Sequence, residues 1–300
     1  MSQGAKRNPA RRRVGLVAGG AMVAVVLAGA LVGPFLAPYS PTAQLLELRL
    51  QPPGEGHPLG LDELGRDVLS RLLFGARVSV AVGFAVVAIA GTIGTAIGAL
   101  AGYAGGAVDA LLMRMTDVVL AFPGILLAIA LVAVLGPALP HVVLALAVIG
   151  WVGYARLVRG QVLKLREEEF VLAARSAGVP ARRVVLRHVL PNVLPLLVVQ
   201  ATLGMAGAVL AEAGLSFLGL GQPPPGSSWG AMINAGRAHL LDAPHVALFP
   251  GLAIVWTVLG LNFLGDGLVD ALDPRRRRVV EVAQVALPAS GSRPNRARPA

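Results

Sequence analysis

The feature that most constrains this chain is a set of long stretches without Asp, Glu, Lys or Arg. They lie at 14–46, 78–108, 118–155, 188–211 and 243–265. A helix needs roughly 20 apolar residues to cross a bilayer core about 30 Å thick, and each stretch is long enough. Charged residues make up 14% of the chain, against about 25% in soluble domains. This composition excludes a soluble globular enzyme, and we expect an all-α polytopic membrane protein.

The number of spans depends on two breaks in this pattern. The stretch at 118–155 would reach about 57 Å as one helix, and Gly136-Pro137-Ala138-Leu139-Pro140 interrupts it. We therefore predict two spans there and six transmembrane helices in total. A further charge-free run, 213–236, contains Pro223-Pro224-Pro225 and many glycines, which a continuous helix does not tolerate. We expect it to form a re-entrant or surface loop.

The first apolar run and the basic residues indicate orientation. Arg11-Arg12-Arg13 could begin a signal peptide, but the run from Val14 to Leu36 exceeds the roughly 7–15 apolar residues of such a segment. We expect an uncleaved span. Most of the 26 Lys and Arg residues lie in 1–13, 104–117, 156–187 and 266–300. The positive-inside rule then places both termini in the cytoplasm. It also explains the net charge of +10 through membrane lipid, without nucleic acid as a partner.

The expected organisation follows from these spans. It consists of a basic cytoplasmic N-tail (1–13), a first span with an extracytoplasmic segment (14–77), a five-helix core (78–265) and a cytoplasmic C-tail (266–300) that is largely disordered from about 282. The core contains the long cytoplasmic loop 156–187. Residues 62–77 are expected to form a short amphipathic helix that leads into the second span.

Catalytic and metal-binding chemistry is not evident in the sequence, so we assign no catalytic and no metal residue. There is no cysteine. A P-loop needs Gly-Lys followed by Ser or Thr, and Lys6 and Lys164 follow Ala5 and Leu163. The chain therefore has no P-loop through which to hydrolyse ATP. Of five histidines, only His57 stays open, as a weak metal contact.

The spans also lack the ionisable residues that proton-coupled carriers use as relays. Glu212 and Asp266 are placed at span ends, where we expect caps or loop anchors. A transporter of this kind must take its energy from a partner.

The loop 156–187 could receive that energy. Residues 167–177 predict a helix of about three turns, with acids in its first turn and Gly178 and Pro180 after its end. Phe170, Ala173, Ala174 and Ala177 can form one small apolar face. This pattern fits a docking site for a partner, and an ordinary connecting helix is the alternative.

Several motifs resemble the ABC importer permeases. Ala173-Ala174, Gly178 and Leu190-Pro191 resemble the Glu-Ala-Ala loop of that family, with Leu172 at the position of its glutamate. Glu169, about one turn earlier, is a candidate substitute. The segment 57–71 is similar to the region before the second span in the C-type permease of the dipeptide, oligopeptide and nickel group. The stretches 215–230 and 264–275 resemble the outer loop and the C-terminal signature of that group.

The resemblance implies a type I ABC importer permease fold and a set of partners. These are a homologous second permease, two P-loop ATPases that carry ATP and Mg²⁺, and an extracytoplasmic solute-binding protein. The chain itself would hold no cofactor, and its solutes would be dipeptides, oligopeptides or nickel chelates. The resemblance places ATPase coupling on Glu169, Phe170, Leu172, Ala173, Ala174, Arg175, Ala177 and Gly178. We expect the outer gate or the binding-protein contact at Ser216, Phe217 and Trp229.

Structural roles are expected for three further groups. Asp62, Arg66 and Asp67 could pair and cap the outer helix. Arg114 and Asp117 are three residues apart on one helix face and could form an ion pair, near Asp109. The spacing of Gly94, Gly98 and Gly102 favours close helix packing.

Two other functions remain open from the residues alone. A self-sufficient secondary carrier or channel would be active without partners and would favour polar spans. A membrane-embedded enzyme would need a catalytic cluster at the membrane surface.

Overall fold

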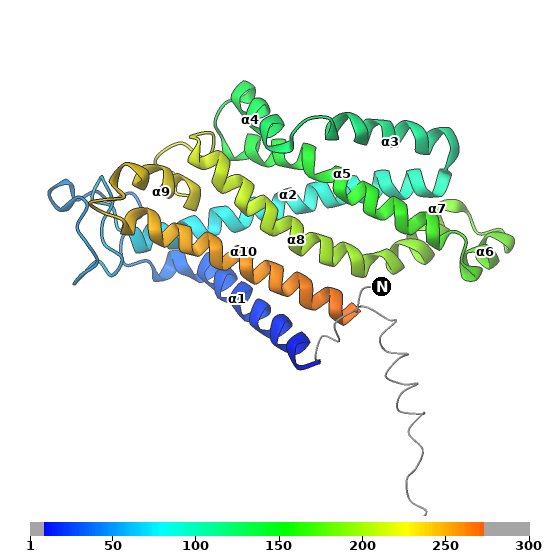
Figure 1. Ribbon diagram of the computed structural model, residues 1–300, viewed down its shortest axis with the longest axis horizontal. Coiled ribbons are helices and arrows are strands. Elements are labelled where there is room, and N and C mark those ends of the chain that lie inside the picture. Colours follow the sequence, from blue (N-terminus) through cyan, green and yellow to red (C-terminus); the bar gives the residue numbers. More distant parts are fainter. Residues whose placement is uncertain (1–8, 273–300) are drawn as a thin grey trace, which may run out of the picture.

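The computed structural model describes residues 9–272, and the side chains of 15–272, as an assembly of helices without extended strands (Figure 1). The long helices lie roughly along one axis. The helices are α1 (Pro9–Leu36), α2 (Val68–Ala104), α3 (Gly106–Leu120), α4 (Gly124–Leu135), α5 (Leu139–Leu165), α6 (Glu169–Ser176), α7 (Ala181–Val184), α8 (Leu190–Phe217), α9 (Trp229–Gly236) and α10 (His245–Leu272). Short 3₁₀ turns, η1 (Leu46–Leu48) and η3 (Arg237–His239), and a π-helical turn, η2 (Val185–Val189), complete them. The expected all-α membrane class is confirmed.

Five helical segments of the described chain are long and apolar enough to cross a membrane. They are α1, α2, α5, α10 and the continuous run 181–217 that joins α7, η2 and α8. A sixth span exists if α3 and α4, which meet at an angle of 81°, are counted together. The prediction of six spans therefore holds if the bent pair α3–α4 counts as one span. The predicted break at 136–140 separates α4 from α5.

The third span differs from the expectation at its start and near its middle. Residues 104–117 were expected as a cytoplasmic loop, but 106–120 form α3, because the only glycine lies at its first position and no proline occurs within it. The helix ends before Pro123, which lacks an N–H and restricts the residue that precedes it. The chain turns there, and the apolar α4 begins at Gly124.

Helix α2 begins at Val68, earlier than the charge-free stretch at 78. Asp67 caps it by accepting a hydrogen bond of 2.7 Å from the backbone N–H of Ser70. Residues 62–67 form a turn instead of the expected amphipathic helix, with Gly65 at φ +69°. The second span therefore begins about three helical turns before the apolar run, directly after residues 37–67.

Glycines bring the main helices into close contact. A Cβ at Gly94, Gly98 or Gly102 of α2 would collide with backbone or Cβ atoms of Tyr154, Ala155 and Val162 on α5. On the other side of the bundle, Gly19 of α1 lies against Gly260 and Leu264, and Gly267 of α10 lies against Leu16. The predicted close packing of the α2 glycines is confirmed, and α1 and α10 form a second tight, antiparallel pair.

Helix α8 is longer than expected at its C-terminal end. It continues from 211 to Phe217, because the first residue that interrupts it is Gly219, at φ +80°. The predicted loop 213–236 is therefore corrected: its first five residues are helical, its middle contains the three prolines, and its last eight residues form α9. We call residues 218–236 the outer segment.

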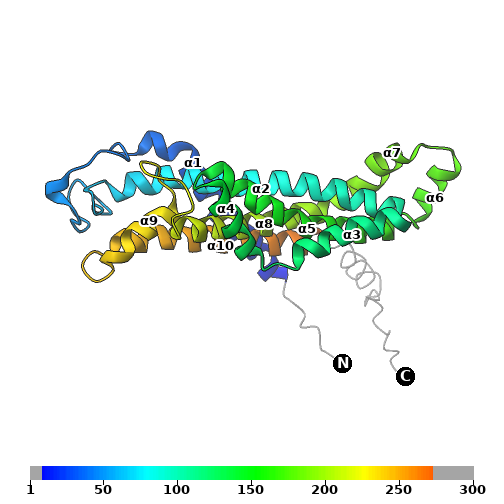
Figure 2. The ribbon, with the colours of Figure 1, turned by 90° about the horizontal axis from the view of Figure 1, so that it is seen from above.

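The two ends of the bundle carry different structures. Residues 37–67 and the outer segment, which includes α9, lie at one end of the bundle. Helices α6 and α7 lie at the opposite end (Figures 1 and 2). The predicted N-tail before Pro9, the disorder from about 282 and the motif residues Asp273, Pro274 and Arg275 lie outside the described residues.

Candidate functional site

The end of the molecule that carries α6 holds the predicted coupling residues. The helix is shorter than expected, from Glu169 to Ser176, because α5 continues to Leu165 and occupies the first part of the predicted loop 156–187. The buried side chain of Val171 attaches α6 to a core cluster that includes Val158 and Val162 of α5 and Val189 next to α8. Because Val171 faces the core, the opposite side of α6 faces away from the rest of the protein.

Most of the predicted coupling residues lie on the exposed side of α6. Phe170 and Leu172 each retain 43% of their exposure, and Glu169, Ala173 and Ala177 are exposed. Ala174 is different, since it is half-buried against the same core cluster as Val171. The apolar face predicted from sequence is thus divided, with Phe170, Ala173 and Ala177 exposed and Ala174 packed inward.

Two arginines tie this end to α2. Arg166 donates a hydrogen bond of 3.1 Å from Nη1 to the carbonyl of Gly102, and Arg175 lies 6.0 Å over the ring of Tyr103. Gly178 follows α6 with φ +75°, a conformation that L side chains rarely adopt. The position of α6 is therefore set by the turn at Gly178 that follows it and by contacts with the C-terminal end of α2.

Ion pairs join α3 to α5, and they differ from the pair expected from sequence. Asp117 accepts a hydrogen bond of 2.6 Å from Arg156, and Asp109 accepts two, of 2.5 and 2.6 Å, from Arg159. The predicted pair between Arg114 and Asp117 is wrong. Arg114, three residues away on the same helix, competes with Arg156 of the neighbouring helix, which binds Asp117 and also donates from Nε to the hydroxyl of Thr116 at 3.3 Å.

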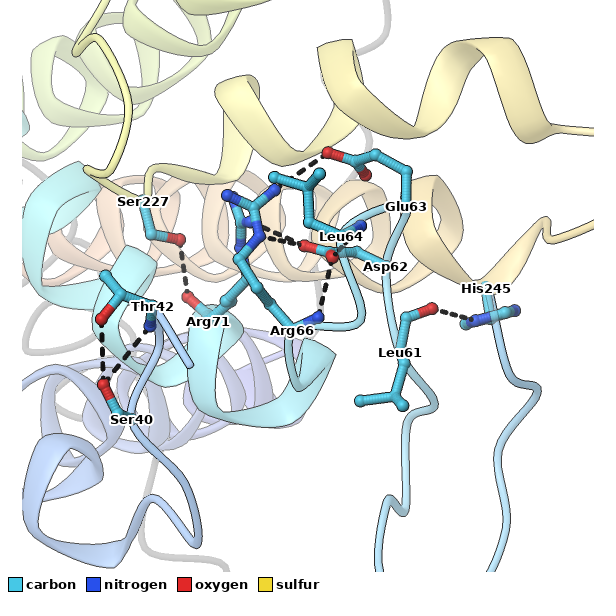
Figure 3. Close-up of polar contacts among 10 residues, drawn as sticks. All are labelled: Ser40, Thr42, Leu61, Asp62, Glu63, Leu64, Arg66, Arg71, Ser227 and His245. Carbon is cyan, nitrogen blue, oxygen red and sulfur yellow. Dashed lines mark hydrogen bonds and ion pairs between the residues drawn. The ribbon is translucent and has the colours of Figure 1, made fainter. Parts of the chain in front are cut away.

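A network of buried charges organises the opposite end (Figure 3). The carboxylate of Asp62 accepts hydrogen bonds of 2.7 Å from Arg66 and 2.6 Å from Arg71, and two more of 2.9 Å from the backbone N–H groups of Leu64 and Arg66. Asp62, Arg66 and Arg71 are all buried. The predicted pairing of Asp62 with Arg66 is confirmed, and Arg71 is an additional partner that joins the outer turn to α2.

His57 and Asp67 form a second contact in the same region. The two side chains are buried, with 2.9 Å between His57 Nδ1 and Asp67 Oδ1, and the His57 ring lies 4.7 Å from that of Tyr39. Among the described residues, no group of three His, Cys, Asp or Glu side chains could hold a metal ion. The open interpretation of His57 as a metal contact therefore receives no support from its surroundings.

Asp62 provides a test of this network. We expect Asp62→Ala to lower the free energy of unfolding by about 3–5 kcal/mol, because Arg71 would stay buried without its carboxylate. Thermal unfolding of the purified protein in detergent measures the change. Glu55→Ala, at an exposed position of the same segment, should change stability by less than about 0.5 kcal/mol. Equal midpoints for both variants would contradict this assignment.

The three residues predicted for the outer gate occupy different environments. Trp229 and Ser216 are buried, and Trp229 Nε1 donates a hydrogen bond of 3.0 Å to the carbonyl of Leu72. Phe217 keeps 37% of its exposure, with Arg237 5.7 Å over its ring. Trp229 therefore anchors α9 to α2, and Phe217 is the member of this group that other molecules can reach.

The sequence interpretation missed two features. Glu212, expected as a cap at a span end, is fully buried within α8. An open, apolar groove of about 1160 Å³ also lies between α2 and the α7–α8 run, with Tyr154 among its lining residues. The acidic residue between long apolar runs was a visible signal for the first, whereas the groove depends on how the helices pack. Ala181 and Arg182 of α7, the helix that follows α6 in the chain, belong to the lining of the groove.

These observations define a multi-span helical membrane protein with a structured cap at one end of the bundle and an exposed helix at the other. Residues 94–278 match the family model described as the binding-protein-dependent transport system inner membrane component, and residues 10–53 match the N-terminal TM domain of oligopeptide transport permease C. The chain belongs to this family of permeases and is of the oligopeptide permease C type.

Individual relatives agree with the family. A protein of Brucella suis biovar 1 named as a peptide transport system permease is 44% identical over 263 residues, which cover 88% of this chain and 87% of the relative. The glutathione transport system permease protein GsiD of Escherichia coli O6:K15:H31 is 50% identical over 223 residues, 74% of each chain.

Membership of the family determines the class of function. The chain is a multi-pass inner-membrane permease subunit of a binding-protein-dependent ABC importer, and it is not itself catalytic. Its partners are an ATPase, a second permease and a binding protein.

Proposed function

We propose that this permease forms half of an import pathway for short peptides, including glutathione-like tripeptides. The observation that carries the proposal is the similarity over 88% of the chain to a protein named as a peptide transport system permease, together with 50% identity to a glutathione permease. The partner permease is a homologous chain, and two P-loop ATPases energise the pair.

The exposed side of α6 supports the docking of an ATPase there. Phe170, Leu172 and Ala173 present a small apolar surface, and residues of this kind permit close approach of a partner. Leu172 replaces the glutamate of the family motif, so an apolar contact takes the place of a polar one. Glu169 is exposed in the first turn and can supply a carboxylate near it.

The orientation that we propose places α6 and both termini in the cytoplasm and residues 37–67 outside. Because the chain has no cysteine, single cysteines can report it. In intact cells, a membrane-impermeant maleimide should label Glu55→Cys and should label Ser2→Cys only after the membrane is permeabilised. The reverse pattern would contradict the orientation.

Uptake tests the solute. Membranes from cells that express the complete transporter should take up labelled glutathione or dipeptides when ATP and the binding protein are supplied, and should not do so without the ATPases. Uptake of a nickel chelate in place of peptides would contradict the proposed solute class. Uptake by this chain alone in liposomes would instead favour the self-sufficient carrier or channel.

A further inference from the structure

Glu212 is a carboxylate buried inside the membrane bundle without a cationic partner. Its residue is 0% exposed, on α8. None of the ion pairs found among residues 15–272 includes it. A buried carboxylate is strongly unfavourable unless other groups satisfy its oxygens, so its hydrogen-bond donors determine its role.

Two serine hydroxyls from two helices donate hydrogen bonds to the carboxylate of Glu212, and a third serine lies close to it. Ser216, one turn later on α8, donates to Oε1 at 2.6 Å, and Ser79 of α2 donates to Oε2 at 3.2 Å. The hydroxyl of Ser228, which precedes α9, lies close to the same carboxylate. All three serines are buried. A single carboxylate therefore links α8 to α2 through hydrogen bonds and lies beside the start of α9.

Ser228 connects this junction directly to the outer segment. Its hydroxyl oxygen caps α9 by accepting a hydrogen bond of 3.3 Å from the backbone N–H of Ala231. The neighbouring Ser227 donates to the carbonyl of Arg71 at 3.1 Å (Figure 3), and Trp229 donates to Leu72. The start of α9 is thus held to α2 by two polar contacts with backbone carbonyl groups.

The outer segment also packs closely at this point. A Cβ at Gly230 would collide with Ala213 and Ser216 of α8. Ala213, Trp229 and Met232 belong to one buried cluster with Val68 and Ala76 of α2. The segment 218–236 therefore closes the space between α2 and α8, and it has no room to shift gradually while Glu212 keeps its donors.

We propose that Glu212 is the positioning residue that holds the outer segment closed against α2 and α8. The outer end opens for solute when the carboxylate exchanges the hydroxyl of Ser79 for water and Ser228 moves away from it with α9. Partial separation is disfavoured because it leaves the buried carboxyl group of Glu212 with too few hydrogen-bond partners. The two arrangements are thus discrete, as an alternating gate requires. This proposal rests on the transport function proposed above.

The rate of thiol labelling measures opening without a transported solute. The chain lacks cysteine, so Ala213→Cys, buried beneath α9 in the cluster of Trp229, provides one reporter. The transporter is assembled with its cysteine-free partner subunits in right-side-out vesicles without ATP. An impermeant maleimide is then added outside. Labelling of this chain should be slow in the parent, since the reporter is covered.

The variants should separate the carboxylate from its donors. Glu212→Ala should speed labelling about tenfold, the effect of losing hydrogen bonds to a charged group. Glu212→Gln keeps an acceptor oxygen and its shape, and serine hydroxyls can rotate to accept from its NH₂ group, so its labelling should stay within about twofold of the parent. Glu55→Gln, an exposed carboxylate at the same end, is the matched control and should change nothing.

A double-mutant cycle tests whether the serines act on opening through Glu212. Ser79→Ala and Ser228→Ala should each speed labelling about threefold when Glu212 is present and have no effect when Glu212→Ala is already introduced. A role only in folding would lower thermal stability without this dependence.

Several outcomes would overturn the proposal. Labelling of Glu212→Ala at the parent rate would do so, and so would serine effects that are equal with and without the carboxylate. If Glu212→Ala does not reach the membrane, parent-rate labelling in both serine variants is the contradicting result. Labelling requires no solute. Failure to import peptides would therefore reject the proposed solute class without changing the labelling rates that test the role of Glu212.

Discussion

Replacing Gly98 with leucine is expected to prevent the permease from accumulating in the membrane. A Cβ at this position would lie against the carbonyl oxygen and Cα of Ala155 on α5, and backbone atoms in the middle of a helix cannot move aside. Even Gly98→Ala should lower the free energy of unfolding by about 1–3 kcal/mol, the usual effect of overpacking. Membrane levels and thermal unfolding in detergent measure the two variants.

The control for this prediction lies on the facing helix. A Cβ at Gly160 of α5 would meet no atom within 4 Å, so Gly160→Ala should change little and can even stabilise the helix, because alanine has the higher helix propensity. If Gly98→Ala and Gly160→Ala behave alike, close contact between α2 and α5 is not what this glycine provides.

Replacing Ala173 with tryptophan is expected to uncouple the permease from its ATPase. Ala173 is exposed on α6, away from the buried Val171 that fixes the helix. A large side chain there should leave the fold of this chain intact and hold the partner away. We expect the affinity for the ATPase to fall by a factor on the order of tenfold or more, seen as loss of the ATPase during copurification.

Ala238→Trp is the matched control, since Ala238 is also an exposed alanine but lies at the opposite end, in η3. It should retain the ATPase. Retention of the ATPase by Ala173→Trp would show that coupling uses another surface. Loss of both permeases from the membrane would indicate misfolding, which thermal unfolding of the purified variant separates from weak docking.

Some tertiary contacts were predictable because they follow from local spacing. Gly94, Gly98 and Gly102 repeat every four residues, so they lie on one face of any helix that contains them. The pair of Asp62 with Arg66 lies within one turn of the chain, and it forms as expected. Such contacts depend little on which helix becomes the neighbour.

Other contacts were not predictable because the competing partner is distant in sequence. Asp117 was expected to pair with Arg114, three residues away, but Arg156 of α5 takes that position in the structure. Glu212 was expected at a boundary, but the hydroxyl group of Ser79 on α2 donates a hydrogen bond to it where it is buried. In both cases a neighbouring helix supplied polar groups that local spacing could not reveal.

The sequence by itself determined the membrane class, the break near Pro140, the missing P-loop and the family. These properties depend on composition and local motifs, because lipid requires long apolar helices in which each backbone group is satisfied. Only the tertiary structure decided the bend between α3 and α4, the division of α6 into a packed and an exposed side, and the burial of Glu212. Those properties depend on which helices meet, and van der Waals packing and hydrogen bonding between distant segments select that arrangement.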